Sequence, residues 1–242
     1  IPLSPLSFLA RTADIFGART AVVYGKRQYS WQQTYERCRA LASALSQHGL
    51  GLGDTVSIIA ANTPEMFEAH FGVPMAGCVL NTINTRLEAE TIAYILNDSD
   101  SKLVIADTAF HDSVKAALKM LRHNIEVIDI RDPALGDLPG IGYKDYEAFI
   151  AGGSPDYEWQ LPADEWQALT LSYTSGTSGR PKGVVYHHRG SYLMSFGTVA
   201  AWQLGQHPTY LYTVPMFHCN GWGHAWTMAL MAAKIVLTRT IT

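Results

Sequence analysis

The segment Tyr173-Thr-Ser-Gly-Thr-Ser-Gly-Arg-Pro-Lys-Gly-Val184 is the most informative part of this 242-residue sequence. Within ten residues it places one lysine, Lys182, beside three glycines and four hydroxyl side chains: Gly176, Gly179, Gly183, Thr174, Ser175, Thr177 and Ser178. Glycine lets a backbone approach a ligand closely, and successive N–H groups in such a loop form an anion-binding concavity to which hydroxyls add donors. The segment therefore suits a polyphosphate.

The segment is not the phosphate loop of common ATPases and kinases. That loop needs Gly-Lys-Ser/Thr followed by the start of a helix. Here Pro181 precedes Lys182, Gly183 follows it, and the apolar residues 184–186 are expected to continue as a strand. An ordinary Ser/Gly surface turn is the other interpretation, which the full twelve-residue string disfavours.

Outward from this loop, short apolar runs alternate with helical periodicity. We expect an α/β fold with much parallel sheet. The expected elements are a hairpin of strands 21–24 and 28–31, a helix over 32–47, a strand over 55–60, a helix starting at Asn62-Thr63-Pro64, a strand over 102–106, a helix over 111–121, strands over 125–130 and 168–173, and a helix over 190–202. Residues 131–164 are rich in Pro, Gly and Asp, which predicts a surface connection or a boundary between two lobes near 131–166.

Three segments together resemble one family. The loop resembles the phosphate-binding signature of the acyl-adenylate-forming, AMP-binding superfamily, with Ser178 where Thr is more usual. Phe71–Leu87 resembles a second core motif in the form found in acyl-CoA synthetases, a helix that turns at Gly77 into a strand. Val214-Pro-Met-Phe-His-Cys-Asn-Gly-Trp222 resembles the motif that lines the acyl pocket of fatty-acyl ligases, including medium-chain ones.

The resemblance covers essentially the whole chain and implies the N-terminal portion of an acyl-CoA synthetase-like large domain, with mixed and parallel sheets flanked by helices. It implies ATP, Mg²⁺ and CoA as cofactors: a carboxylate attacks the α-phosphate to give acyl-AMP and pyrophosphate, and the CoA thiol then displaces AMP. Catalysis then consists mostly of alignment and charge neutralisation.

The same resemblance assigns the site residues. Thr174, Ser175, Gly176, Thr177, Ser178, Gly179 and Lys182 hold the β- and γ-phosphates, Lys182 and His218 are catalytic, and His218, Asn220, Gly221 and Trp222 contact the acid. For His218 the alternative is an ordinary, partly buried histidine, and for Trp222 a core tryptophan. Arg189 is expected to be a solvated charge at a helix start rather than a CoA-phosphate ligand.

The family normally has about twice this length. We expect the acidic residue that grips Mg²⁺, the ribose-binding aspartate, the hinge and the lid lysine to lie beyond Thr242. Residues 1–242 are thus expected to form a partial N-terminal AMP-binding domain without the C-terminal lid, which alone completes neither half-reaction.

Charge is distributed unevenly. Residues 1–165 carry all 21 acidic side chains and 13 of the 18 basic ones, whereas residues 166–242 carry five basic side chains and no acidic one. An acid-free segment does not repel an anionic ligand, although a buried core is also poor in acids. The basic residues form no run, so nucleic acid is not an expected partner. Apolar surface near the end of the chain predicts self-association into a homo-oligomer.

Three cysteines without a CxxC pair favour a reducing compartment, and we expect a cytoplasmic location without a signal peptide or membrane insertion. The spacing of His187, His188, His218, Cys219 and His224 does not predict a metal site. The leading interpretation is an acid–CoA ligase for short- to medium-chain aliphatic acids. The alternatives are an adenylating enzyme that delivers to a carrier-protein thiol, and a non-catalytic nucleotide-binding fragment.

Overall fold

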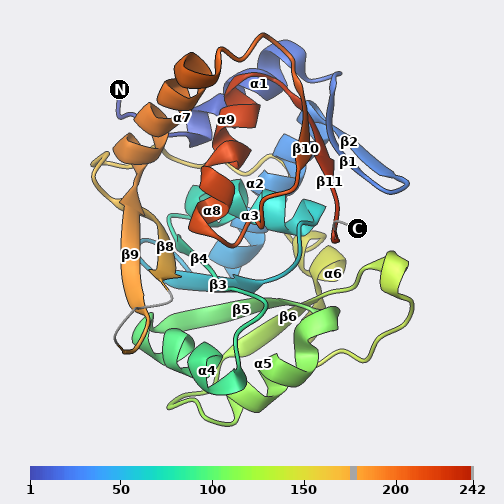
Figure 1. Cartoon of the computed structure of the whole chain (residues 1–242), viewed down its shortest axis with the longest axis vertical. Helices are drawn as coiled ribbons and strands as arrows, with labels where there is room; N and C mark the ends of the chain where they lie inside the picture. Colours follow the sequence, from blue (N-terminus) through green and yellow to red (C-terminus); the bar gives the residue numbers. More distant parts are fainter. Residues whose placement is uncertain (175–178, 241–242) are drawn as a thin grey trace.

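The computed structural model describes residues 1–174 and 179–240, and its centre is a seven-stranded sheet (Figure 1). The strand order is β7-β6-β5-β3-β4-β8-β9, and neighbours run parallel except β8 and β9, which are antiparallel. The strands are β3 (Thr55–Ile59), β4 (Val79–Thr82), β5 (Ser101–Asp107), β6 (Glu126–Ile130), β7 (Lys144–Asp145), β8 (Ala168–Thr174) and β9 (Lys182–His187). The predicted α/β class with mixed and parallel sheet is confirmed.

Helices cover both faces of this sheet. The helices α4 (Ala89–Asp98) and α5 (His111–Leu118) lie on one face, below it in Figure 1, over a cluster that includes Ile59, Ile95 and Val104. The helices α2 (Trp31–Gln47) and α3 (Pro64–Met75) lie on the other face. Strands buried on both faces read as continuous apolar runs, which is why β3 and β5 were recognisable in the sequence.

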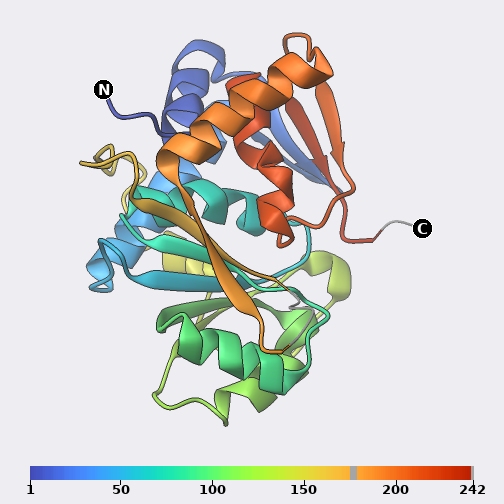
Figure 2. The ribbon, with the colours of Figure 1, turned by 60° about the vertical axis from the view of Figure 1, so that its left-hand side comes forward.

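A second sheet of four strands packs above α2 and α3. Its order is β10-β11-β1-β2, and it joins the predicted hairpin of β1 (Thr20–Tyr24) and β2 (Arg27–Ser30) to β10 (Thr209–Tyr212) and β11 (Lys234–Leu237). The helices around it are α1 (Leu6–Phe16), α7 (His188–Trp202) and α9 (His224–Leu230). Figure 2 shows β9 leading directly into α7 along one side of the molecule.

Short elements complete the chain. They are α6 (Tyr146–Ile150), α8 (Cys219–Trp222) and the 3₁₀ turns η1 (Thr108–Phe110) and η2 (Pro133–Leu135). The segment predicted as a connection or lobe boundary holds η2, β7 and α6, and β7 extends the large sheet.

Local signals explain several helix starts. At α2, the Ser30 side chain accepts from the Gln33 N–H while the Gln33 side chain accepts from the Ser30 N–H, a complete capping box. At α3, the Thr63 hydroxyl accepts from the Met66 N–H and Pro64 occupies the first turn, as predicted. The turn predicted at Gly77, where φ is +83°, is also present and leads into β4.

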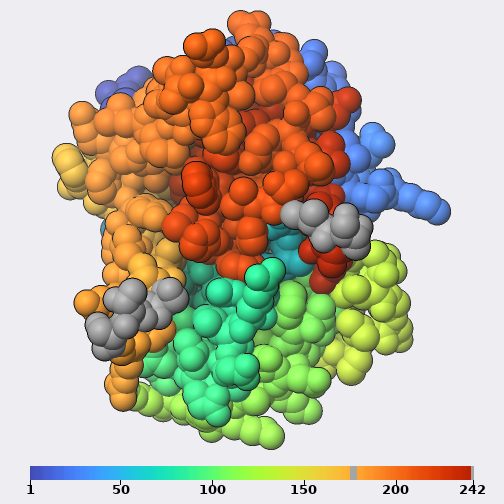
Figure 3. All heavy atoms as spheres, viewed as in Figure 1, coloured from blue at the N-terminus to red at the C-terminus, as the bar shows by residue number. Residues whose placement is uncertain are grey.

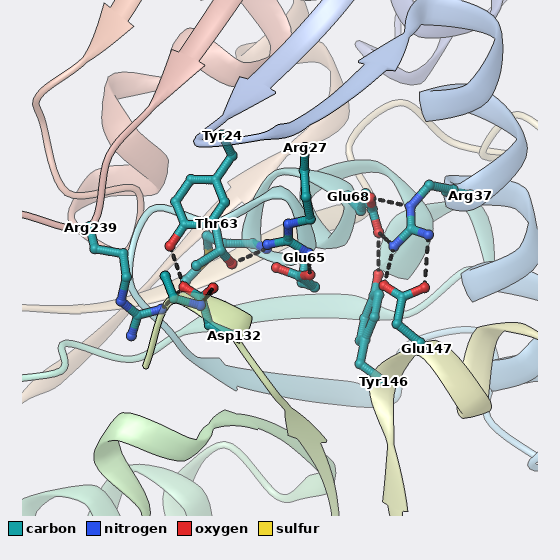
Figure 4. A network of polar contacts seen from close by, with 12 residues as sticks. Tyr24, Arg27, Arg37, Thr63, Glu65, Glu68, Asp132, Tyr146, Glu147 and Arg239 are labelled. Atoms are coloured by element: carbon teal, nitrogen blue, oxygen red, sulfur yellow. Dashed lines mark hydrogen bonds and ion pairs between the residues drawn. The ribbon is translucent and has the colours of Figure 1, made fainter. Parts of the chain in front are cut away.

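The helix α3 is buried on every side, although it carries two carboxylates. Glu65 pairs with Arg27 of the hairpin at 2.6 Å, and Glu68 pairs with Arg37 of α2 at 2.6 Å (Figure 4). Tyr146 of α6 also donates to Glu68, at 2.8 Å. Burial outweighs these contacts and raises the pKa of Glu68 to about 7. A buried charge without a partner costs several kcal/mol, so these pairs fix how the layers meet.

A second buried cluster joins the two sheets. Arg239, just after β11, donates to Asp107 and to Asp132, both at 2.8 Å. Asp107 is the last residue of β5, and Asp132 lies two residues after the end of β6. Tyr24 of β1 donates to the same Asp132 carboxylate (Figure 4). Both aspartates are essentially inaccessible to solvent.

Apolar side chains are exposed along the segment from β9 to α8. They include Val185, Leu193, Phe196, Trp202 and Leu211. Self-association through this surface stays a prediction. Among the described helices, none combines the length and apolar character that a membrane span requires.

Removing Arg239 should destabilise the fold. In Arg239→Ala, Asp107 and Asp132 remain buried without their cation, and we expect the free energy of unfolding to fall by about 3–5 kcal/mol in urea titrations. The control Lys102→Ala breaks a pair whose aspartate, Asp100, is 70% exposed, and it should cost less than about 1 kcal/mol. Equal losses in the two variants would contradict the role assigned to Arg239.

Candidate active site

Two cavities meet at His218 and Cys219. The larger cavity, about 650 Å³, lies between β9, α7 and residues 218–226, and its lining is mostly apolar. The second, which we term the loop cavity, measures about 470 Å³ and lies beside the described ends of the phosphate loop. Tyr186, His218 and Cys219 line both, so a ligand could extend from one into the other at this point.

One face of α7 forms a wall of the larger cavity. The lining residues Ser191, Met194, Thr198 and Trp202 recur every three or four positions, the spacing of a single helical face. Trp222 and Trp226 lie opposite, from the chain around α8 and α9. Such a mostly apolar lining suits a hydrocarbon or aromatic group.

The loop cavity lies where β8 ends and β9 begins. Thr174 and Lys182 are paired across these antiparallel strands. Side chains alternate along a strand, so Lys182 shares a face with Val184 and Tyr186, which both line the loop cavity. Within the described ranges, no carboxylate lies within ion-pair distance of Lys182, and its charge is therefore free to attract an anion.

The structure locates only part of the predicted phosphate loop. Thr174 and Gly179 line the loop cavity together with Pro181. Ser175, Gly176, Thr177 and Ser178 lie outside the described residues. Their contacts with phosphate stay a prediction.

The chain from Cys219 to Gly223 forms a left-handed turn. Five successive φ values are positive, at 47°, 52°, 56°, 60° and 68°, and three of the residues are not glycine: Cys219, Asn220 and Trp222. The left-handed region costs a non-glycine residue about 1–2 kcal/mol, so the surrounding structure must hold this turn.

Buried hydrogen bonds hold it. The Asn220 side-chain oxygen accepts from the hydroxyls of Thr170, at 2.9 Å, and Ser172, at 3.2 Å, both on β8. Tyr212 of β10 donates to the Gly221 carbonyl at 3.0 Å. Asn220 and Gly221 are buried and line neither cavity, so they lie behind the wall rather than on it, and their predicted contact with the acid stays a prediction.

His218 and Trp222 lie on the wall itself. His218 is exposed, lines both cavities, and places Nε2 3.9 Å from the Cys219 thiol. Trp222 is 59% exposed and lines the larger cavity. Burial, and next the nearby Cys219, raise the pKa of Tyr186, which keeps its phenol protonated at neutral pH.

Asn62 positions the chain that leads to His218, a role that the sequence did not reveal. Its amide nitrogen donates to the carbonyls of Tyr212 and Val214, and its oxygen accepts from the Met216 N–H at 2.8 Å. Thr82 of β4 donates to the Phe217 carbonyl at 3.0 Å. In the sequence, Asn62 was recognisable only as part of a helix start, and nothing there linked it to a segment 150 residues away.

The start of α7 is as predicted, but Arg189 is not. His187 Nδ1 caps the helix by accepting from the Gly190 N–H at 2.9 Å. Arg189, expected to be a solvated charge, instead pairs with Glu165 at 2.5 Å. Glu165 precedes the acid-free segment directly, and it also accepts from the Leu3 N–H.

No group of three or more His, Cys, Asp or Glu side chains that could hold a metal ion occurs in residues 1–174 and 179–240. His187, His188, His218, Cys219 and His224 are instead divided between a helix cap, the core and the cavity wall.

Comparison with known proteins shows the family. The sequence model of the AMP-binding enzymes matches residues 9–242. The chain belongs to the AMP-binding enzyme family. The resemblance found in the sequence is therefore confirmed.

Relatives in the family are acid–CoA ligases. An acetate–CoA ligase of Humulus lupulus is 44% identical over 252 residues, which cover 99% of this chain and 44% of that protein. A peroxisomal acetate/butyrate–CoA ligase of Arabidopsis thaliana shows the same identity and coverage. A 2-methylpropanoate–CoA ligase of Humulus lupulus is 40% identical, over 98% of this chain and 44% of that protein.

Solved structures share the fold. The inhibitor-bound N-terminal domain of FACL13 from Mycobacterium tuberculosis aligns with a TM-score of 0.87 at 21% identity, over 100% of this chain and 58% of that one. An anthranilate CoA ligase in complex with anthranoyl-AMP aligns with a TM-score of 0.86 at 22% identity, over 100% and 46%. The chain thus spans about half the length of the relatives that it matches.

The comparisons overturn the expected cytoplasmic location. Several relatives are named as peroxisomal, among them the acetate/butyrate–CoA ligase and a benzoate–CoA ligase of Arabidopsis thaliana. The inference from cysteines failed because unpaired thiols indicate a reducing environment, not a particular compartment.

The left-handed turn should not tolerate a side chain at Gly221. A Cβ there would lie 2.1 Å from the Tyr212 hydroxyl oxygen, at a φ of +56°. We expect Gly221→Ala to lower the free energy of unfolding by about 2–4 kcal/mol in urea titrations, through overpacking and backbone strain together.

The matched control is Gly49→Ala, where φ is +85° but no atom lies within 4 Å of the added Cβ. It should report the backbone cost alone, about 1 kcal/mol. If the two variants lose the same stability, the contact with Tyr212 is not what requires glycine at position 221.

Proposed function

We propose that the protein to which this chain belongs activates a carboxylic acid with ATP and transfers the acyl group to CoA. The observation that carries the proposal is the meeting of the two cavities at His218. An apolar cavity on one side suits an acyl chain, and the cavity on the other side borders a loop whose composition suits phosphates. Their junction is where a carboxylate would meet the α-phosphate.

In the proposed first step, a carboxylate oxygen attacks the α-phosphorus of ATP, and the bond to the β-phosphate bridging oxygen breaks. The products are acyl-AMP and pyrophosphate. The chain supplies alignment and charge: Lys182 and the loop N–H groups hold the β- and γ-phosphates, while the His218 imidazole donates a hydrogen bond to the carboxylate or the acyl phosphate. In the second step the CoA sulfur attacks the acyl carbon, and AMP leaves.

The described residues fit these groups unequally. The loop cavity borders Thr174 and Gly179, the described ends of the loop, and suits a polyphosphate, whereas Lys182 is not among the residues that line it. Among the described residues, no group of three or more His, Cys, Asp or Glu side chains could hold Mg²⁺. Arg189 is paired with Glu165 and gives no support to a CoA-phosphate site.

Two relatives at 44% identity are named for the short aliphatic acids acetate and butyrate, which favours a short aliphatic acid, while relatives at 39–40% are named for 2-methylpropanoate, benzoate and trans-cinnamate. Delivery to a carrier-protein thiol is the alternative for the second step. The relatives named as CoA ligases favour CoA, and CoA-dependent release of AMP without a carrier protein would decide between the two.

Acid-dependent exchange of pyrophosphate into ATP tests the proposal, with the full-length polypeptide that contains this chain and a panel of aliphatic and aromatic acids. We expect exchange with at least one acid class, and a loss of about 100-fold or more in Lys182→Ala and in His218→Ala, since each removes a group directed at developing charge. The control Lys102→Ala removes a surface lysine far along the sheet and should retain full activity. Undiminished exchange in Lys182→Ala would overturn the assigned role, and no exchange with any acid would overturn the proposed function.

A further inference from the structure

His224 is one of the polar side chains that line the mostly apolar larger cavity, and Ser191, Thr198 and His218 are among the others. His224, the first residue of α9, lines this cavity and is 2% exposed overall. It does not line the loop cavity, unlike His218 and Cys219. Its ring contacts Trp202, the last lining residue of α7, at 4.7 Å between ring centroids. His224 therefore lies beside the C-terminal end of α7 and outside the loop cavity.

The neighbours of His224 fix which ring nitrogen faces the cavity. Nδ1 lies 2.5 Å from the Tyr210 hydroxyl. Nε2 has no hydrogen-bond partner among the described residues, and it is not one of the unpaired atoms that are fully enclosed, so it opens to the cavity.

The tautomer can be assigned from the same pair. Within the described part of the chain, Nδ1 is the only acceptor that the Tyr210 hydroxyl reaches. We therefore assign the phenol as the donor to Nδ1, and this assignment puts the ring proton on Nε2. Burial lowers the pKa of His224, so the ring is neutral near pH 7. The cavity thus contains a fixed, uncharged N–H donor.

We propose that His224 makes the acyl cavity select acids that carry a hydrogen-bond acceptor, such as a carbonyl oxygen, several atoms from the carboxylate. The proposal rests on the function proposed above and adds a substrate class to it. Without an acceptor, binding of an alkyl chain would desolvate the Nε2–H and leave it unpaired, which costs binding free energy. An acceptor at the matching distance removes that cost.

Acid pairs of equal length provide the test, in acid-dependent pyrophosphate exchange with the full-length enzyme. The pairs are pentanoate with 4-oxopentanoate, hexanoate with 5-oxohexanoate, and heptanoate with 6-oxoheptanoate. The measured quantity is the ratio of kcat/KM for the oxo acid to that for the alkanoate. Both values come from the same protein sample, so a loss of folded protein cancels.

For at least one pair we expect the unmodified enzyme to use the oxo acid at least as well as the alkanoate. In His224→Phe, which keeps an aromatic ring of similar size, that ratio should fall about tenfold. His224→Gln keeps an N–H donor and should recover part of the ratio. Ser191→Ala, which removes another polar group of the same cavity, should leave the ratio unchanged.

An unchanged ratio in His224→Phe, with exchange still active, would overturn the inference while leaving the proposed function intact. So would an equal fall in Ser191→Ala, or a preference for the alkanoate in every pair with the unmodified enzyme. Absence of exchange with every acid would instead overturn the proposed function, and this inference with it.

Discussion

The ion pairs of α3 are the constraint on which the rest of the structure depends. A helix buried on all sides cannot leave Glu65 and Glu68 unpaired, and their arginines come from the hairpin and from α2. These pairs thereby fix the helix against the four-stranded sheet and against α2. Asn62 lies immediately before it and holds the chain that leads to His218, so the position of the candidate active site follows from the way α3 is held.

The site combines a rigid frame with local strain. Thr170, Ser172 and Tyr212 come from regular strands, and they hold a turn whose backbone few side chains tolerate. This arrangement brings His218 and Trp222 to the wall and keeps Asn220 behind it. In the view of Figure 3, the C-terminal segment, in orange and red, covers the upper part of the molecule, and the green segment that carries α4 and α5 lies below it.

Most of the fold could be predicted from the sequence because the signals are local. Apolar runs identified β3 and β5, Asn62-Thr63-Pro64 marked a helix start, and residues 173–184 identified the family. The predicted site residues were all close together in the sequence, and side chains that hold the site from distant parts of the chain were not predicted. Asn62 and Thr170 lie 50 residues or more from the segments that they hold. The left-handed backbone at Cys219 and Trp222 could not be predicted, because neither residue type favours positive φ. Arg189 was misjudged because its partner, Glu165, comes from the preceding loop.

The left-handed turn also bears on how freely this protein can be redesigned. Most domains lie only a little above the stability that function needs, so changes in a substrate pocket are limited by how much stability they remove. Here part of that margin is held as strain at Cys219 and Trp222, next to the cavity that a redesign would alter. Glycine at either position adopts the same backbone without steric strain, although it loses more conformational entropy on folding and removes a side chain from the cavity wall. Relieving the backbone strain in this turn could therefore offset stability that other substitutions in the cavity remove.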